Sequence, residues 1–199
     1  ARRSSAIGMA NDRESELHYP LGDALPDLGA TLDVAPGVRW VRMALPFALD
    51  HVNLWLLRDR DADDGTEGWS IVDCGITSDA TKAAWEQVFA EHLDGLPVLR
   101  VISTHMHPDH VGLAHWLTRR WSSERRECRL WMSATDWNGA RLASAGAMVS
   151  GATSADFFAS HGMTDPASLE KVRGRTTYYS GLVPEVPRRF RRLLDGQRI

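Results

Sequence analysis

The first half of the chain alternates apolar and polar positions in short runs, which is the pattern of β-strands. Three such runs, rich in β-branched and aromatic residues, are VRWVRMAL (38–45), VNLWLLRD (52–59) and WSIVDCG (69–75). The second run is the most apolar, which predicts burial on both faces. An Asp- and Gly-rich turn at 60–68 follows it. Three strands in succession predict an antiparallel meander.

Beyond the third run, the pattern switches between helical and strand periodicity. Ser78 or Asp79 can cap a helix whose apolar residues recur at helical spacing. The later elements alternate in the same way, with strands predicted at 98–104 and 128–133 and helices at 109–121 and 134–147. Strands that alternate with helices indicate an α/β fold in which helices pack on a sheet.

The two ends of the chain differ from this middle part. Residues 1–35 are polar and punctuated by prolines, which predicts an irregular N-terminal arm ahead of a domain over residues 36–149. Residues 150–199 begin with two helical patterns, at 154–162 and 165–181. We interpret these two patterns as a helical insertion beside the sheet.

Two local signals refine the description of this last segment. Asp165, followed by a proline, predicts the start of a helix. Asp195-Gly196 lies between two potential strand arms and is a hairpin signal, but its return arm would be residues 197–199 alone. We therefore expect residues 150–199 to hold the insertion and the start of a truncated second half, so that the chain is the N-terminal portion of a longer polypeptide.

Composition excludes several classes of protein. With 43% hydrophobic and 25% charged residues, the chain is neither disordered throughout nor a fibrous repeat. It has no apolar run of the roughly 20 residues that span a bilayer. Two cysteines, Cys74 and Cys128, are too few for a disulfide scaffold, so we expect a cytoplasmic protein. Acidic residues outnumber basic ones in residues 1–100 and the reverse holds in 101–199, which indicates either solvated helix faces or a basic wall that favours an anionic substrate.

The chemistry of the sequence is concentrated in the pattern HxHxDH at residues 105–110. This pattern comes directly after an apolar strand and directly before a helix, where α/β folds display their ligands. In extended backbone, His105 and His107 point the same way, so both can bind one metal ion. The proline that follows bends the chain, so Asp109 and His110 can face a second ion. Imidazole and carboxylate ligands suit Zn²⁺, with iron or manganese as alternatives.

HxHxDH after an apolar strand resembles the signature of the metallo-β-lactamase superfamily of metallohydrolases, which includes glyoxalase II-like thioesterases, lactonases and tRNA-processing nucleases. Two further segments agree, since LPFALDHVNL (45–54) is similar to the superfamily's early strand and IVDCG (71–75) to its VDTG turn, with Cys74 in place of the commoner Thr. The resemblance covers about residues 38–133. It implies the first half of an αββα sandwich, whose metallo-β-lactamase-like domain is residues 36–149.

The resemblance also implies a role for each residue of the pattern. His105 and His107 would bind the first of two zinc ions, and Asp109 and His110 the second. Asp109 would also act in catalysis, by orienting the hydroxide that bridges the two metals and attacks the substrate. A bound metal ion lowers the pKa of water to about 7, so hydroxide exists at neutral pH. Asp73, at the end of a neighbouring strand, could accept a hydrogen bond from a ligand histidine or only cap a turn.

The superfamily completes its site with two more histidines and a bridging aspartate, all from its second half. After residue 110 this chain has only His115 and His161. His115 falls within a predicted helix, where we expect it to be packed or at the surface. His161 comes just before Gly162 near a helix end, where we expect it to cap the helix or to be exposed. The chain should therefore supply at most half of the site and bind metal poorly alone.

We expect a metal-dependent hydrolase that cleaves an ester, thioester or lactone of a small-molecule substrate, with the helical insertion as part of the wall that selects this substrate. Three alternatives stay open. The same site could cleave phosphodiesters, although an arginine cluster at 188–192 is the one feature that suits nucleic acid. A truncated half-sandwich could instead be non-catalytic and pair as a homodimer through an exposed apolar sheet face. An iron-dependent oxygenase on the same scaffold would differ in its metal.

Overall fold

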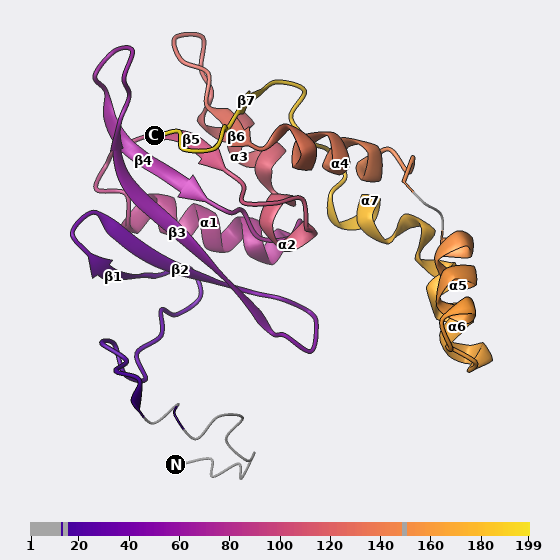
Figure 1. Ribbon diagram of the computed structural model, residues 1–199. Coiled ribbons are helices and arrows are strands. Elements are labelled where there is room, and N and C mark those ends of the chain that lie inside the picture. The colour runs from indigo at the N-terminus through magenta and orange to yellow at the C-terminus, as the bar shows by residue number, and fades with distance from the viewer. Residues whose placement is uncertain (1–12, 14–15, 149–150) are drawn as a thin grey trace.

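The structure is a computed structural model that describes residues 13, 16–148 and 151–199 (Figure 1). In this part of the chain, seven strands form one sheet whose spatial order follows the sequence. They are β1 (Thr31–Ala35), β2 (Val38–Ala44), β3 (His51–Arg60), β4 (Glu67–Val72), β5 (Val98–Ile102), β6 (Arg129–Met132) and β7 (Phe190–Arg192). Strands β1 to β4 pair antiparallel and strands β4 to β7 pair parallel, so the sheet is mixed.

The predicted antiparallel meander is confirmed as β2, β3 and β4. Strand β1 corrects the expectation that the chain is irregular up to residue 35. Pro36 and Gly37 form a two-residue turn that returns β1 onto β2, and Gly37 adopts a φ of 74°, which glycine tolerates without strain. The rest of the expected arm has no strand or α-helix where it is described, and its residues 1–12, 14 and 15 lie outside the described residues.

Helices follow the sheet strands from β4 onward. They are α1 (Asp79–Glu91), α2 (Pro108–Val111), α3 (Ala114–Trp121), α4 (Ala134–Ser144), α5 (Gly151–Ser160), α6 (Pro166–Arg173) and α7 (Tyr178–Leu182), with a 3₁₀ turn at Gly174–Thr177. Both predicted caps are present, since the Ser78 side chain accepts a hydrogen bond from the Thr81 amide at 3.0 Å and Asp165 accepts one from the Ser168 amide at 2.8 Å. Each helix in the described part of the chain is too short or too polar to cross a bilayer.

Two predicted helices are divided. The helix expected over 109–121 breaks at Gly112, where a Cβ would lie only 2.8 Å from the Gly75 carbonyl oxygen. The Leu113 amide donates to this same oxygen at 3.2 Å, so a backbone contact with the turn after β4 ends the helix. The helix expected over 165–181 likewise gives way to a 3₁₀ turn that begins at Gly174. Helix α2 is thus a short element that carries the end of HxHxDH.

The C-terminal hairpin signal is realised only as a turn. The Gln197 amide donates to the Leu194 carbonyl at 3.1 Å across Asp195-Gly196, but residues 197–199 form no strand. Strand β7 instead extends the sheet by pairing parallel to β6.

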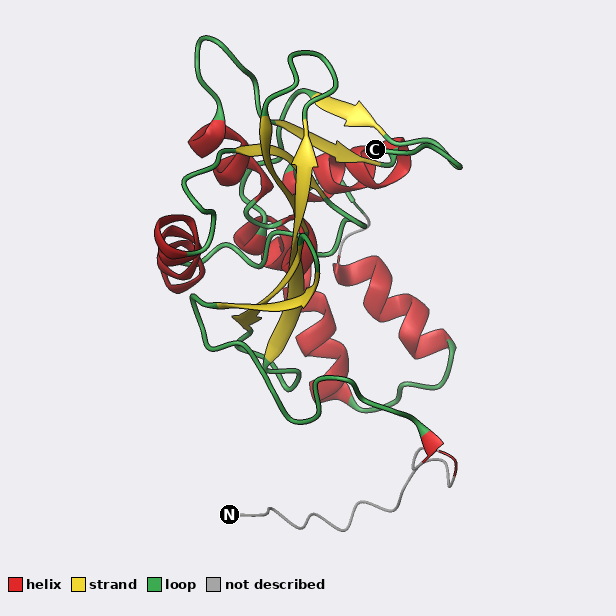
Figure 2. Ribbon diagram, turned by 90° about the vertical axis from the view of Figure 1, so that its left-hand side faces the viewer, coloured by secondary structure: helices red, strands yellow, loops and turns green. Residues whose placement is uncertain are grey.

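Helices α1 and α3 lie side by side on one face of the sheet (Figures 1 and 2). Phe89 of α1 stacks on Trp116 of α3, with ring centroids 6.2 Å apart. Beneath them, Leu54, Ile71 and Val101 from three successive strands are fully buried. This core fixes the positions of β4, which leads into Asp73, and of β5, which leads into the HxHxDH pattern at 105–110.

The opposite face of the sheet carries an aligned row of apolar side chains. In register order the row consists of Trp40, Trp55, Val72, Ile102 and Trp131, one from each strand β2 to β6. Each of these side chains is partly exposed, and each points away from the helix-covered core because side chains alternate along a strand. An apolar row of this kind is typical of a sheet face that packs against another layer.

A pair of glycines allows the cost of the close approach after β4 to be measured. Gly75 and Gly95 both have positive φ, at 80° and 73°, but a Cβ at Gly75 would lie 2.9 Å from Thr81 Cγ2, whereas Gly95 faces open space. We expect Gly95→Ala to lower the free energy of unfolding by about 1 kcal/mol through backbone strain alone. Gly75→Ala should cost about 1–3 kcal/mol more through overpacking. Urea unfolding of both variants checks this, and equal losses would contradict it.

Candidate metal centre

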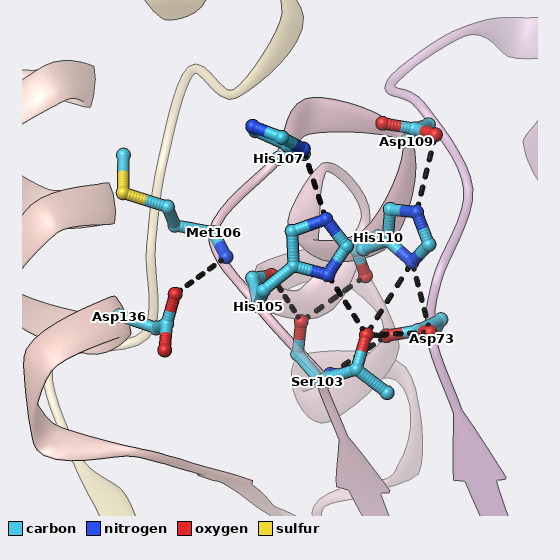
Figure 3. Close-up of polar contacts among 9 residues, drawn as sticks. Asp73, Ser103, His105, Met106, His107, Asp109, His110 and Asp136 are labelled. Carbon is cyan, nitrogen blue, oxygen red and sulfur yellow. Dashed lines mark hydrogen bonds and ion pairs between the residues drawn. The ribbon is translucent and has the colours of Figure 1, made fainter.

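Three successive parallel strands deliver polar residues to one edge of the sheet. Asp73 follows β4, HxHxDH at 105–110 follows β5, and Asp136 lies just after β6 (Figure 3). The carboxyl ends of parallel strands meet at the same edge, which brings these segments together. Ser103, which is almost fully buried, anchors the start of the loop, because its hydroxyl donates to the His105 carbonyl at 3.0 Å.

His105 and His107 form the first pair of candidate ligands. Their atoms Nε2 and Nδ1, respectively, lie 2.9 Å apart, and both rings project from the loop toward one another (Figure 3). Two nitrogens bound to one tetrahedral zinc at about 2.05 Å lie about 3.3 Å apart. The pair therefore needs only a small separation to hold one ion between the two nitrogens.

Asp109 and His110 form the second pair, on helix α2. The Asp109 Oδ2 atom lies 3.2 Å from His110 Nε2, a spacing that also fits two ligands of one ion. The rings of His105 and His110 are adjacent, with centroids 4.1 Å apart, so the two pairs are neighbours. The local sequence produces this arrangement because Pro108 starts α2 and turns the chain between the pairs.

Asp73 fixes His110 of the second pair through a hydrogen bond to its ring. It is 5% exposed, and its Oδ2 atom lies 2.9 Å from His110 Nδ1. This contact keeps a proton on Nδ1, which leaves Nε2 of the same ring with a lone pair on the Asp109 side. Asp73 adopts a φ of 64°, unusual for a residue other than glycine, and such strain concentrates at functional sites.

The pKa values of His105 and His110 are shifted in opposite directions. Burial lowers the pKa of His110, but the hydrogen bond and charge of Asp73, together with Asp109, outweigh burial, so the pKa of His110 is raised above 6.5. Burial, followed by the charges of His110 and His107, lowers the pKa of His105 below the same value. At neutral pH the His105 ring is therefore neutral and able to bind a metal ion, whereas a larger fraction of His110 rings carries a second proton.

Thr104 has a role that the sequence pattern did not reveal. Its amide donates to Asp73 Oδ1 at 2.8 Å, and its hydroxyl lies 3.0 Å from His105 Nδ1. Thr104 thus links the Asp73 carboxylate to both pairs of candidate ligands. Because Asp73 lies on another strand, no local pattern around Thr104 indicates this link.

The candidate centre supplies donors as two pairs. Among the described residues, no group of three or more His, Cys, Asp or Glu side chains is placed to hold a metal ion. His115 pairs with Glu185 at 3.1 Å, and the exposed His161 contacts the Phe157 carbonyl at the end of α5, so each lies as the sequence predicts. The candidate centre therefore consists of two neighbouring pairs of donors, each short of the three protein ligands that a catalytic zinc ion usually has.

Comparisons with known proteins agree with this fold. A family model described as the metallo-beta-lactamase superfamily matches residues 48–178. Among solved structures, a beta-lactamase domain protein from Burkholderia ambifaria is 54% identical, with a TM-score of 0.82 over 95% of this chain and 51% of that chain. A metallo-beta-lactamase family protein from Thermus thermophilus is 25% identical, with a TM-score of 0.57 over 83% of this chain and 48% of that chain. A search of curated proteins gives no match.

The chain spans about half the length of both of these structures. The predicted α/β fold, the first half of an αββα sandwich with a helical insertion, is confirmed by the structure and by its match to the Burkholderia protein. The family model covers most of the chain, and the Burkholderia protein is similar over nearly all of it. The chain belongs to the metallo-beta-lactamase superfamily.

Proposed function

We propose that the whole protein is a metal-dependent hydrolase that cleaves an ester, thioester or lactone of a small molecule. Membership of the superfamily suggests a metal-dependent hydrolase in general. The observation that carries the proposal is the pair of two-ligand sets in HxHxDH, with His110 held by buried Asp73. Residues outside the described part would supply the ligands that these two sets lack.

Each described residue then has a defined task. His105 Nε2 and His107 Nδ1 would hold one ion, and Asp109 and His110 Nε2 the other, with zinc as the proposed metal and iron or manganese as alternatives. A bound divalent ion lowers the pKa of water to about 7 and polarises the substrate carbonyl. The second carboxylate oxygen of Asp109 would accept a hydrogen bond from the attacking water and orient it. Asp73 would keep the His110 proton on Nδ1.

The charges around the loop favour a carbonyl substrate over a phosphodiester. In the described part of the chain, the partners in the hydrogen bonds and ion pairs of residues 104–110 include Asp73, Asp136 and the loop's own histidines and carboxylate, and no arginine or lysine side chain. Sites that bind nucleic acid surround the phosphates with basic side chains. Two residues of the arginine cluster lie elsewhere, since Arg191 covers the Trp131 ring and Arg189 lies 3.8 Å from Glu127.

Zinc affinity tests the proposed centre directly. We expect the chain to bind zinc at least about tenfold more tightly than a His105→Ala/His107→Ala variant, because that variant lacks one ligand pair. His115→Ala is the matched control, since it removes a histidine that pairs with Glu185 and should leave zinc affinity unchanged. Competition with a chelator gives the affinities, and elemental analysis gives the metal content.

Hydrolysis by the zinc-loaded protein tests the substrate class. We expect turnover of an ester, thioester or lactone in a panel that also holds a phosphodiester, and loss of this turnover in the double variant. Equal zinc binding by the chain and the double variant would overturn the proposed centre. Turnover of the phosphodiester alone would overturn the proposed substrate class.

The pH dependence of the metal-free site follows from its pKa shifts. We expect histidine NMR titration to place the pKa of His110 above 6.5 and that of His105 below it. Asp73→Asn should lower the pKa of His110, whereas Asp50→Asn, beside His51, should not change it. Protonated His110 stabilises the fold below pH 6.5, and this contribution is lost as the pH rises through its folded pKa. An unchanged His110 titration in Asp73→Asn would contradict the assigned contact.

A further inference from the structure

The peptide groups on both sides of Met106 are held by residues outside the loop. Met106 separates His105 from His107 in the sequence. Its amide donates to Asp136 Oδ1 of helix α4 at 3.1 Å (Figure 3), and its carbonyl accepts from the Tyr179 hydroxyl of helix α7 at 2.5 Å. Helices α4 and α7, which follow the loop in the sequence, therefore both hydrogen-bond to Met106, the residue between the first pair of candidate ligands.

The Asp136 carboxylate is itself fixed. Its Oδ2 atom accepts a hydrogen bond from the Ser133 hydroxyl at 2.6 Å, and the Asp136 amide donates back to that hydroxyl at 3.0 Å. These reciprocal bonds form the cap of α4, directly after β6. The Asp136 oxygen that accepts from the Met106 amide is therefore held in a fixed position just after the end of strand β6.

Tyr179 brings the helical segment to the same residue. Its ring packs against the hydrophobic core, and its hydroxyl reaches Met106. Burial, and then the charge of Asp136, raise the pKa of Tyr179, so its hydroxyl keeps the proton that it donates. Helix α7 follows α5 and α6, so Tyr179 is a direct link from the helical insertion to the loop.

The Met106 side chain makes a third contact with the same region. A Cβ at Gly139 would lie 2.6 Å from Met106 Sδ, so the thioether rests on α4 at a point where the helix has no side chain. The amide, the carbonyl and the side chain of Met106 are thus all placed by α4 and α7. A displacement of α7 would turn the Met106 peptide and with it the direction of the two flanking imidazoles.

We propose that Asp136 and Tyr179 are positioning residues that set the geometry of His105 and His107 through Met106, and that Tyr179 couples the helical insertion to this ligand pair. Any molecule that moves α7 would then change the first pair. The placement of the loop does not depend on the reaction. The proposal rests on the proposed function only for its effect on metal binding.

Removal of one hydroxyl tests the coupling. In the metal-free chain, we expect Tyr179→Phe to speed amide hydrogen exchange in residues 106, 107 and 109–112 by about 5- to 10-fold, because the Met106 carbonyl loses its partner. Tyr178→Phe is the matched control, since the neighbouring Tyr178 is 50% exposed on the same helix. Zinc affinity should fall by about 3- to 10-fold in Tyr179→Phe and stay unchanged in the control.

Three results would overturn the proposal. The first is loop exchange in Tyr179→Phe that equals that of Tyr178→Phe. The second is an equal rise of exchange in strands β2 to β4, which would mean that the hydroxyl only supports global stability. The third is faster loop exchange with unchanged zinc affinity, which would remove the link to the ligands. If the unaltered chain binds no zinc, the proposed metal centre fails, whereas the exchange of the loop amides still decides whether Tyr179 positions the loop.

Discussion

The candidate site depends on one buried carboxylate. Asp73 is 5% exposed, so its charge must be compensated by hydrogen bonds, because an unpaired buried charge is costly. The compensation comes from Thr104 and His110, both on the segment after the neighbouring strand β5. The same carboxylate that needs these donors thereby fixes where the HxHxDH loop lies. Because Asp73 follows β4 and its partners follow β5, the pairing of these two strands also determines where the candidate ligands lie.

Backbone contacts reinforce this dependence. The Cys74 amide donates to the His110 carbonyl at 2.9 Å, and the Leu113 amide donates to the Gly75 carbonyl at 3.2 Å. These contacts require the close approach that only a glycine at residue 112 permits. The helix after the loop breaks there, and the short α2 presents Asp109 and His110 beside the other pair. An unbroken helix would hold neither contact with the turn after β4.

Local patterns predicted what local geometry controls. The spacing of His105 and His107 places two imidazoles on one side of the loop, and alternation of apolar residues predicts the meander. Strand β1 lies in a segment whose prolines and polar residues indicate irregular structure, so the pattern alone does not predict it. The break of the helix at Gly112 and the roles of Thr104 and Tyr179 depend on contacts between segments far apart in the sequence. No periodicity or spacing contains such contacts, so only the structure reveals them.

Two features of the described residues are incomplete, namely the set of candidate metal ligands and the packing of one face of the sheet. The candidate ligands form two pairs at the carboxyl edge of the sheet, each short of a full coordination sphere. The row from Trp40 to Trp131 leaves partly exposed apolar side chains on the sheet face away from α1 and α3. One further layer on that face would bury the row. The similar structures, of which this chain spans 51% and 48%, have the chain length for such a layer. In such an arrangement, one structural layer would both bury the apolar row and stand next to the candidate ligands.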